Sequence, residues 1–161
     1  MPLLPIKDRK TRPLIAEWAP FALGFRPFFL AAGLYAVLMM ALWLAVLNGK
    51  LQLGSLSPFV WHGHEMLFGF AVAVIAGFLL TAAQNWTGIQ TPSGPALAAL
   101  FLLWLAGRVS FFLPGVSVCW VALIDLLFLP VLAVTLAWPI IKARQLFNAP
   151  FPLMLLVLSK N

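Results

Sequence analysis

Long runs of apolar residues separated by short polar segments dominate the pattern along the chain. An α-helix needs about 20 such residues to cross a hydrocarbon core of roughly 30 Å. Three of the runs open on a proline, which a helix tolerates in its first turn because the N–H there has no partner. The pattern therefore predicts an all-α transmembrane helix bundle with four complete spans, at residues 27–48, 58–83, 95–113 and 116–141.

The same pattern divides the chain into three parts. Residues 1–26 form a basic arm with an interfacial segment, and residues 27–144 hold the four spans. Residues 145–161 begin like a fifth span, but their apolar run ends at Leu158. At about 1.5 Å per residue this run cannot cross a core of roughly 30 Å. We therefore expect an incomplete fifth span in a chain that is cut short.

The composition places these helices in a membrane. Hydrophobic residues make up 63% of the chain and charged residues 9%, with a mean hydropathy of +1.03. A water-soluble globule needs more polar surface than this composition supplies. The expected partner of the chain is therefore the lipid bilayer, which it crosses several times.

The positive charges predict how the chain is oriented. Half of the net charge of +6 comes from the N-terminal arm, where it serves as a topology signal and needs no nucleic-acid partner. By the positive-inside rule both ends of the four-span block are cytoplasmic, and the start of the second span faces outward, to the periplasm if the host is a Gram-negative bacterium. The cations behind this prediction are Lys7, Arg9, Lys10, Arg12, Arg26, Lys142 and Arg144.

The second span opens with the sequence WHGHEM, residues 61–66. On a regular helix, its glutamate begins a face of small residues that lets a neighbouring helix approach closely. This face consists of Glu65, Gly69, Ala73 and Gly77. His62, three residues before Glu65, lies on the same face. His64 lies about 200° around the helix from His62. We therefore expect the two imidazoles to serve different partners or different sites.

Five ionisable side chains lie at similar depth in the outer half of the predicted bundle. They are His62, His64, Glu65, Arg108 and Asp125. Each costs free energy in lipid, so together they indicate a shared polar interior. Arg108 and Asp125 are within reach of each other on neighbouring helices. This pair is interpreted as a structural ion pair, with a role in moving substrate or protons as the alternative.

The two histidines are the candidate metal ligands. A carboxylate beside an imidazole can fix the tautomer of the ring, and Glu65 is placed for this role. Hydrogen bonding between helices of the bundle is an equal alternative for Glu65. The residues leave the metal open, because imidazole binds haem iron, copper and zinc. Cys119 is expected to be a small buried hydrophobe. Three methionines are expected to pack against lipid or core rather than to bind copper, namely Met39, Met40 and Met66.

Several motifs occur in the order seen in the NnrS family of bacterial polytopic membrane proteins, which the chain resembles from residue 24 to its end. The motifs are GFRPFFL (24–30), WHGHEMLFGF (61–70), AVIAGFLLTAAQNWTG (73–88), WLAGR (104–108) and IDLLFLP (124–130). The resemblance implies a haem- and copper-containing inner-membrane protein of the nitric oxide response, associated with denitrification. Family members are considerably longer, so this chain resembles their N-terminal portion.

Matched to the family motifs, His62 and His64 are the implied metal ligands. The further positions of interest are Arg26, Glu65, Asn85, Arg108 and Asp125. Nitric oxide is the implied small ligand, and further helices of a longer protein or a second copy of the chain are possible partners. The alternatives are a transporter-like or assembly module that handles haem or copper, and an inactive fragment. Because prolines fall mostly at span ends, the pattern favours a rigid cofactor scaffold over a transporter. Whether the protein is an enzyme stays open.

Overall fold

The computed structural model describes residues 20–51, 57–113 and 115–159, which form a helix bundle without a strand. The all-α prediction is therefore confirmed. The order of elements is α2 (Phe25–Leu47), α3 (Pro58–His64), the π-helix η1 (Glu65–Ala71), α4 (Val72–Thr87), α5 (Pro95–Ser110), α6 (Val118–Lys142), the 3-10 helix η2 (Leu146–Asn148) and α7 (Pro150–Leu158). The cations at positions 7, 9, 10 and 12 lie outside the described residues.

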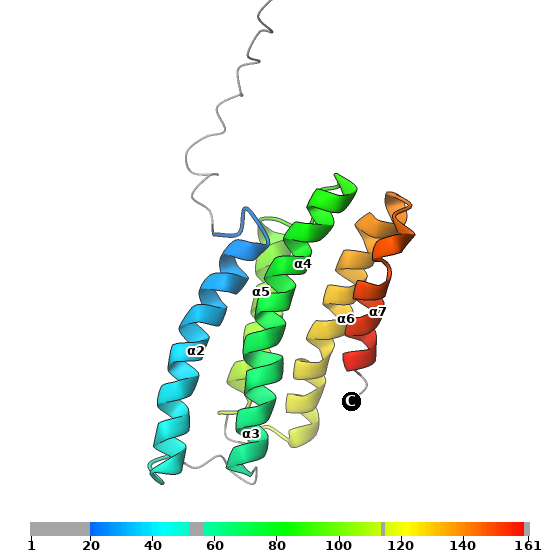
Figure 1. The fold of residues 1–161 in the computed structure, drawn as a ribbon. Helices are drawn as coiled ribbons and strands as arrows, with labels where there is room; N and C mark the ends of the chain where they lie inside the picture. The colour runs from blue at the N-terminus through cyan, green and yellow to red at the C-terminus, as the bar shows by residue number, and fades with distance from the viewer. Residues whose placement is uncertain (1–19, 52–56, 114, 160–161) are drawn as a thin grey trace, which may run out of the picture.

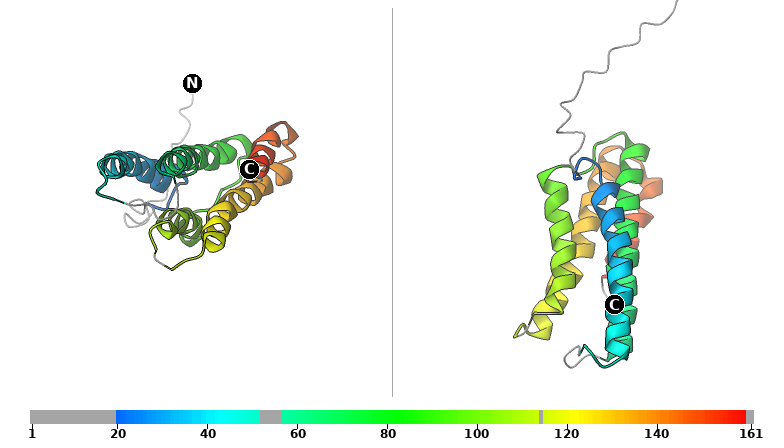
Figure 2. Two further views of the ribbon diagram at one scale, coloured as in Figure 1. Left: turned by 90° about the horizontal axis from the view of Figure 1, so that it is seen from below. Right: turned by 90° about the vertical axis from the view of Figure 1, so that its left-hand side faces the viewer.

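Successive long helices run antiparallel (Figure 1). The helix α2 packs against α4, α5 packs against α6, and α4 meets α6. The view along the bundle shows these helices as two rows, α2 with α4 and α5 with α6 (Figure 2). The short helix α7 folds back on α6. This alternation brings the start of α3, the end of α5 and the start of α6 to one end of the bundle.

Local sequence explains where several helices begin and end. Pro58 and Pro95 stand in the first turns of α3 and α5, where the missing N–H costs nothing. The second long helix ends where Gly88 takes a φ of 68°, a left-handed conformation that glycine adopts without a steric penalty. At the end of α2 the Asn48 side-chain amide donates to the Leu44 carbonyl at 2.7 Å.

In the part of the chain that the structure describes, three helical stretches are long and apolar enough to cross a membrane. They are Phe25–Leu47, Pro58–Thr87 and Val118–Lys142. Helix α5 has 16 residues and falls short of the usual span of about 20, as does the stretch Leu146–Leu158. The number of complete spans and the three-part division of the chain stay predictions.

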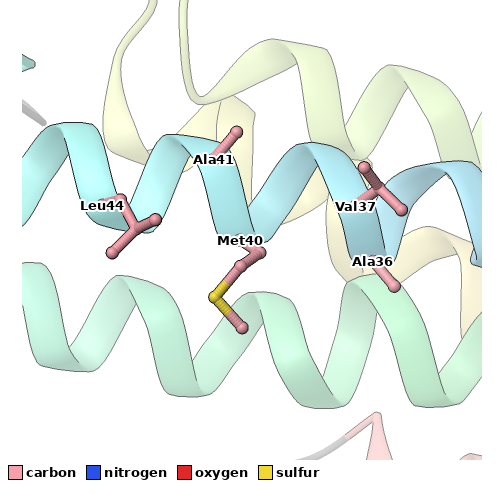
Figure 3. A pocket seen from close by; sticks show the side chains of 5 residues that line it. All are labelled: Ala36, Val37, Met40, Ala41 and Leu44. Atoms are coloured by element: carbon pink, nitrogen blue, oxygen red, sulfur yellow. The ribbon is translucent and has the colours of Figure 1, made fainter.

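Apolar side chains fill the centre of the bundle and also cover much of its outside. Phe28, Leu80, Leu132 and Leu155 are fully buried in the central cluster. On the outer side of α2, a shallow groove of about 490 Å³ is lined by apolar residues alone, which suits contact with lipid (Figure 3). Cys119 was expected to be buried but is exposed, because it lies in the first turn of α6, at the outer surface.

Candidate functional site

The candidate site is a polar network at the bundle end where α3 begins and α5 ends. Its five members come from α2, α3, η1, α5 and α6 and are Tyr35, His64, Glu65, Arg108 and Asp125. Glu65, Arg108 and Asp125 are buried, with exposed fractions of 1%, 4% and 8%. Burial of this kind is costly unless each charge is paired, so the pairing of the network decides what it can do.

Glu65 is the centre of the network. Its Oε2 accepts a hydrogen bond from Arg108 Nη1 at 3.0 Å and a second from the Tyr35 hydroxyl. Its Oε1 lies 3.2 Å from His64 Nδ1. Both oxygens of the buried carboxylate are therefore satisfied by side chains from three other elements.

Asp125 closes the network on the side of α6. It forms an ion pair with Arg108 Nη2, and its Oδ2 lies 2.9 Å from His64 Nε2. His64 and Arg108 each bridge the same two carboxylates. An imidazole donates to two carboxylates only when both nitrogens carry a proton, and in that state two positive and two negative charges balance.

A π-helix directly after His64 shapes the network. The π-helix η1 adds a residue to the turn, and such turns occur frequently at functional sites. Trp104 Nε1 donates to the Gly69 carbonyl within this turn at 3.1 Å. A Cβ on Gly69 would lie 2.5 Å from Tyr35 Cε1 and 2.9 Å from Glu65 Oε2. The glycine thus lets the tyrosine hydroxyl reach the carboxylate.

A second glycine brings α5 against α6. A Cβ on Gly107 would lie 2.9 Å from Asp125 Oδ1 and 3.3 Å from Asp125 Cα. Because the backbones approach this closely, the next residue, Arg108, can place its guanidinium against the aspartate. Further along the bundle, Ala73 and Gly77 are buried, and a Cβ on Gly77 would meet the ring of Phe29 and the Cβ of Phe28 on α2.

His62 lies outside the polar network. Its ring stacks on Trp43 of α2, with centroids 4.2 Å apart and an angle of 16° between the planes. Its Nδ1 is buried without a hydrogen-bond partner, and among the described residues no hydrogen bond involves this side chain. The two histidines thus have different surroundings, His64 between two carboxylates and His62 against an indole.

The contacts of the two histidines limit how a metal could be bound. Within the described residues, no group of three His, Cys, Asp or Glu side chains could hold a metal ion by itself. Both nitrogens of His64 are engaged by carboxylates, whereas the buried Nδ1 of His62 has no partner. The residues present therefore fit a single imidazole ligand from His62, and His64 offers none without breaking a contact.

Two other predicted site residues lie at the opposite end of the bundle. Arg26 is in the first turn of α2, and the exposed Asn85 is near the end of α4. They are therefore separated from the polar network by most of a helix length. Sequence reasoning also missed Tyr35 and Trp43. The signal for Tyr35 was available, because it is the one tyrosine of the chain and carries a hydroxyl in an uncharged span.

Comparison with known proteins gives one match. The family model described as NnrS protein matches residues 19–159. No curated protein and no solved structure matches the chain. The matched range includes all the described helices and every member of the polar network.

Proposed function

The chain belongs to the NnrS family, and from this premise we propose that it is a metal-binding membrane protein of the nitric oxide response, with haem or copper as the bound group. The observation that carries the metal proposal is the buried, unpartnered Nδ1 of His62. An unpaired buried polar atom costs free energy until it finds a partner. A metal bound through the imidazole of His62 would remove that cost.

His62 would hold the group and Trp43 would support it. The indole packs flat against the imidazole and so restricts the directions in which a ring nitrogen can point. Haem iron or copper, once bound, would supply an open coordination position for nitric oxide and a one-electron couple. The surrounding helices are apolar, which suits a small uncharged ligand that dissolves in lipid.

The location proposed for this protein is a bacterial inner membrane. The family and the three long apolar helices make it a membrane protein. Lys142 and Arg144 lie at the bundle end opposite the polar network, which by the positive-inside rule supports a cytoplasmic N-terminus and an outward-facing network.

A transporter-like or assembly module for haem or copper is the second candidate. Interrupted helices in transporters form sites for cargo. Here the π-helix η1 interrupts the second long helix, and Pro130 and Pro139 lie inside α6. Such a module would release its metal readily to a chelator, whereas a resident cofactor would resist it.

The test is an absorption spectrum with metal analysis on the full chain, purified in detergent. We expect a haem band or bound copper that responds to nitric oxide and is lost in His62→Ala. The matched control is Thr135→Ala on α6, whose hydroxyl donates only to Val131 of its own helix, and which should retain the metal. A colourless, metal-free protein, or a spectrum unchanged by His62→Ala, contradicts the proposal.

A further inference from the structure

We infer that His64 and Asp125 are positioning residues, which fix how the second span presents the His62 ligand, and that the polar network keeps His64 itself from binding metal. The inference rests on the proposed function, because it concerns the same ligand. It also assigns different roles to two histidines that the motif makes look equivalent.

Four side chains contact His64. Asp125 and Glu65 engage its two nitrogens at 2.9 and 3.2 Å. The ring of Phe68 stacks on it at 4.8 Å, and the ring of Phe111 lies 5.2 Å away. A metal needs a nitrogen lone pair, so binding one here would break a contact with a buried carboxylate, whose loss is costly.

The two histidines contact neighbouring helices on opposite sides of α3. His62 and His64 are about 200° apart around a helix, and accordingly His62 meets α2 while His64 meets α6. Helix α3 has 7 residues and passes directly into the π-helix. The stack on Trp43 and the contact to Asp125 therefore both contribute to fixing its rotation.

Loss of the Asp125 contact should act on His62 at a distance. Without it, α3 loses a contact to α6, and His62 can leave its present orientation. We expect Asp125→Asn, whose neutral amide weakens the contact to His64, to retain the ligand but to change the geometry in which that ligand meets a metal. His64→Gln should have the same effect, since its amide reaches fewer of the carboxylate oxygens.

The first experiment uses the metal-free protein. Diethyl pyrocarbonate acylates an imidazole nitrogen that is free of a proton and of a partner, and mass spectrometry locates the product. Both histidines are partly exposed, so exposure alone predicts similar rates. We expect His62 to react several times faster than His64 in the wild type. In Asp125→Asn both should react faster, and Thr135→Ala should behave like the wild type.

The second experiment adds haemin or, separately, copper(II). Bound metal should protect His62 from the reagent and leave the rate at His64 unchanged. In Asp125→Asn the metal content should persist while the absorption or electron paramagnetic resonance spectrum shifts. If Asp125→Asn does not fold in detergent, His64→Gln still gives the rate at His62, the metal content and the spectrum.

The outcomes separate this inference from the proposed function. Equal rates at the two histidines in the wild type, or rates at His62 and spectra unaffected by both variants, would overturn the inference. A wild type that takes up neither haemin nor copper would overturn the proposed function. In that case the metal-free rates still decide whether Asp125 and His64 control the orientation of His62.

Discussion

The two halves of the bundle are held together by different forces. At one end, the polar network links four long helices through charged hydrogen bonds. The rest of the interior is an aromatic and aliphatic core, in which Phe28 meets Phe101 edge-on at 5.7 Å and Phe128 at 5.9 Å. Tyr35 belongs to both, since its ring packs edge-on against Trp104 at 5.7 Å and its hydroxyl bonds Glu65.

The difference matters because of the solvent. Lipid tails are as apolar as the core side chains, so burial of apolar surface gives little drive to helix association in a membrane. The apolar half therefore depends on close fit, and close fit alone tolerates alternatives. The polar half is directional, since Arg108 satisfies Glu65 and Asp125 only when α5, η1 and α6 are in this register. We infer that the network selects one arrangement of the helices.

Replacement of Arg108 by leucine should produce the largest effect. It leaves two carboxylates close together with only the His64 imidazole between them, and breaking a buried charge pair costs about 3 to 5 kcal/mol. Reversible unfolding of the full chain in mixed micelles, followed by circular dichroism, measures the loss. Neutralising both acids in the same background, with Glu65→Gln and Asp125→Asn, should restore much of the stability. Failure of this rescue would mean that packing of the arginine, rather than its charge, holds the polar end.

Part of this polar end could be predicted from the sequence. Depth along each span placed Glu65, Arg108 and Asp125 at one level, and the structure contains the expected Arg108–Asp125 ion pair. This succeeded because helix rise is constant, so sequence position converts directly to depth. The small-residue stripe was visible for the same reason. The prediction that the histidines bind metal stays a prediction.

Other parts could not be predicted by counting residues. A π-turn changes the rotation per residue, and no regular sequence period reveals where one is inserted. The orientation of η1 therefore depends on its packing against Tyr35 and Trp104, which only the structure shows. The separation of Arg26 and Asn85 from the network depends on which bundle end each helix terminus occupies. A family motif does not show which of its residues lie close together in the folded chain.

Tyr35→Phe should have an intermediate effect, because it removes one contact between the two halves and keeps the other. The phenyl ring still packs on Trp104, but Glu65 loses the hydroxyl donor. Hydrogen bonds to charged groups contribute about 1.5 to 3 kcal/mol. The same unfolding assay should therefore give a smaller loss than Arg108→Leu. A loss as large as that of the arginine variant would place the tyrosine, rather than the ion pairs, at the centre of the polar end.

Gly77→Ala tests the apolar half and should have the smallest destabilising effect. A Cβ there would lie 2.9 Å from two atoms of the Phe29 ring and 3.1 Å from the Cβ of Phe28. Phe29 is 43% exposed and can turn aside, but Phe28 is fully buried, so overpacking should cost about 1 to 3 kcal/mol. The matched control is Gly33→Ala in α2, where a Cβ meets nothing within 4 Å.

The control should be neutral or stabilise the helix by about 0.5 to 1 kcal/mol, since alanine loses less backbone entropy than glycine. Both substitutions add the same methyl group and the same apolar surface, so a difference between them in the unfolding assay isolates fit from hydrophobicity. Equal effects would mean that α2 and α4 associate without close fit at Gly77. The stability of the apolar half would then not depend on close fit. The apolar half would differ from the polar end only in lacking charged residues.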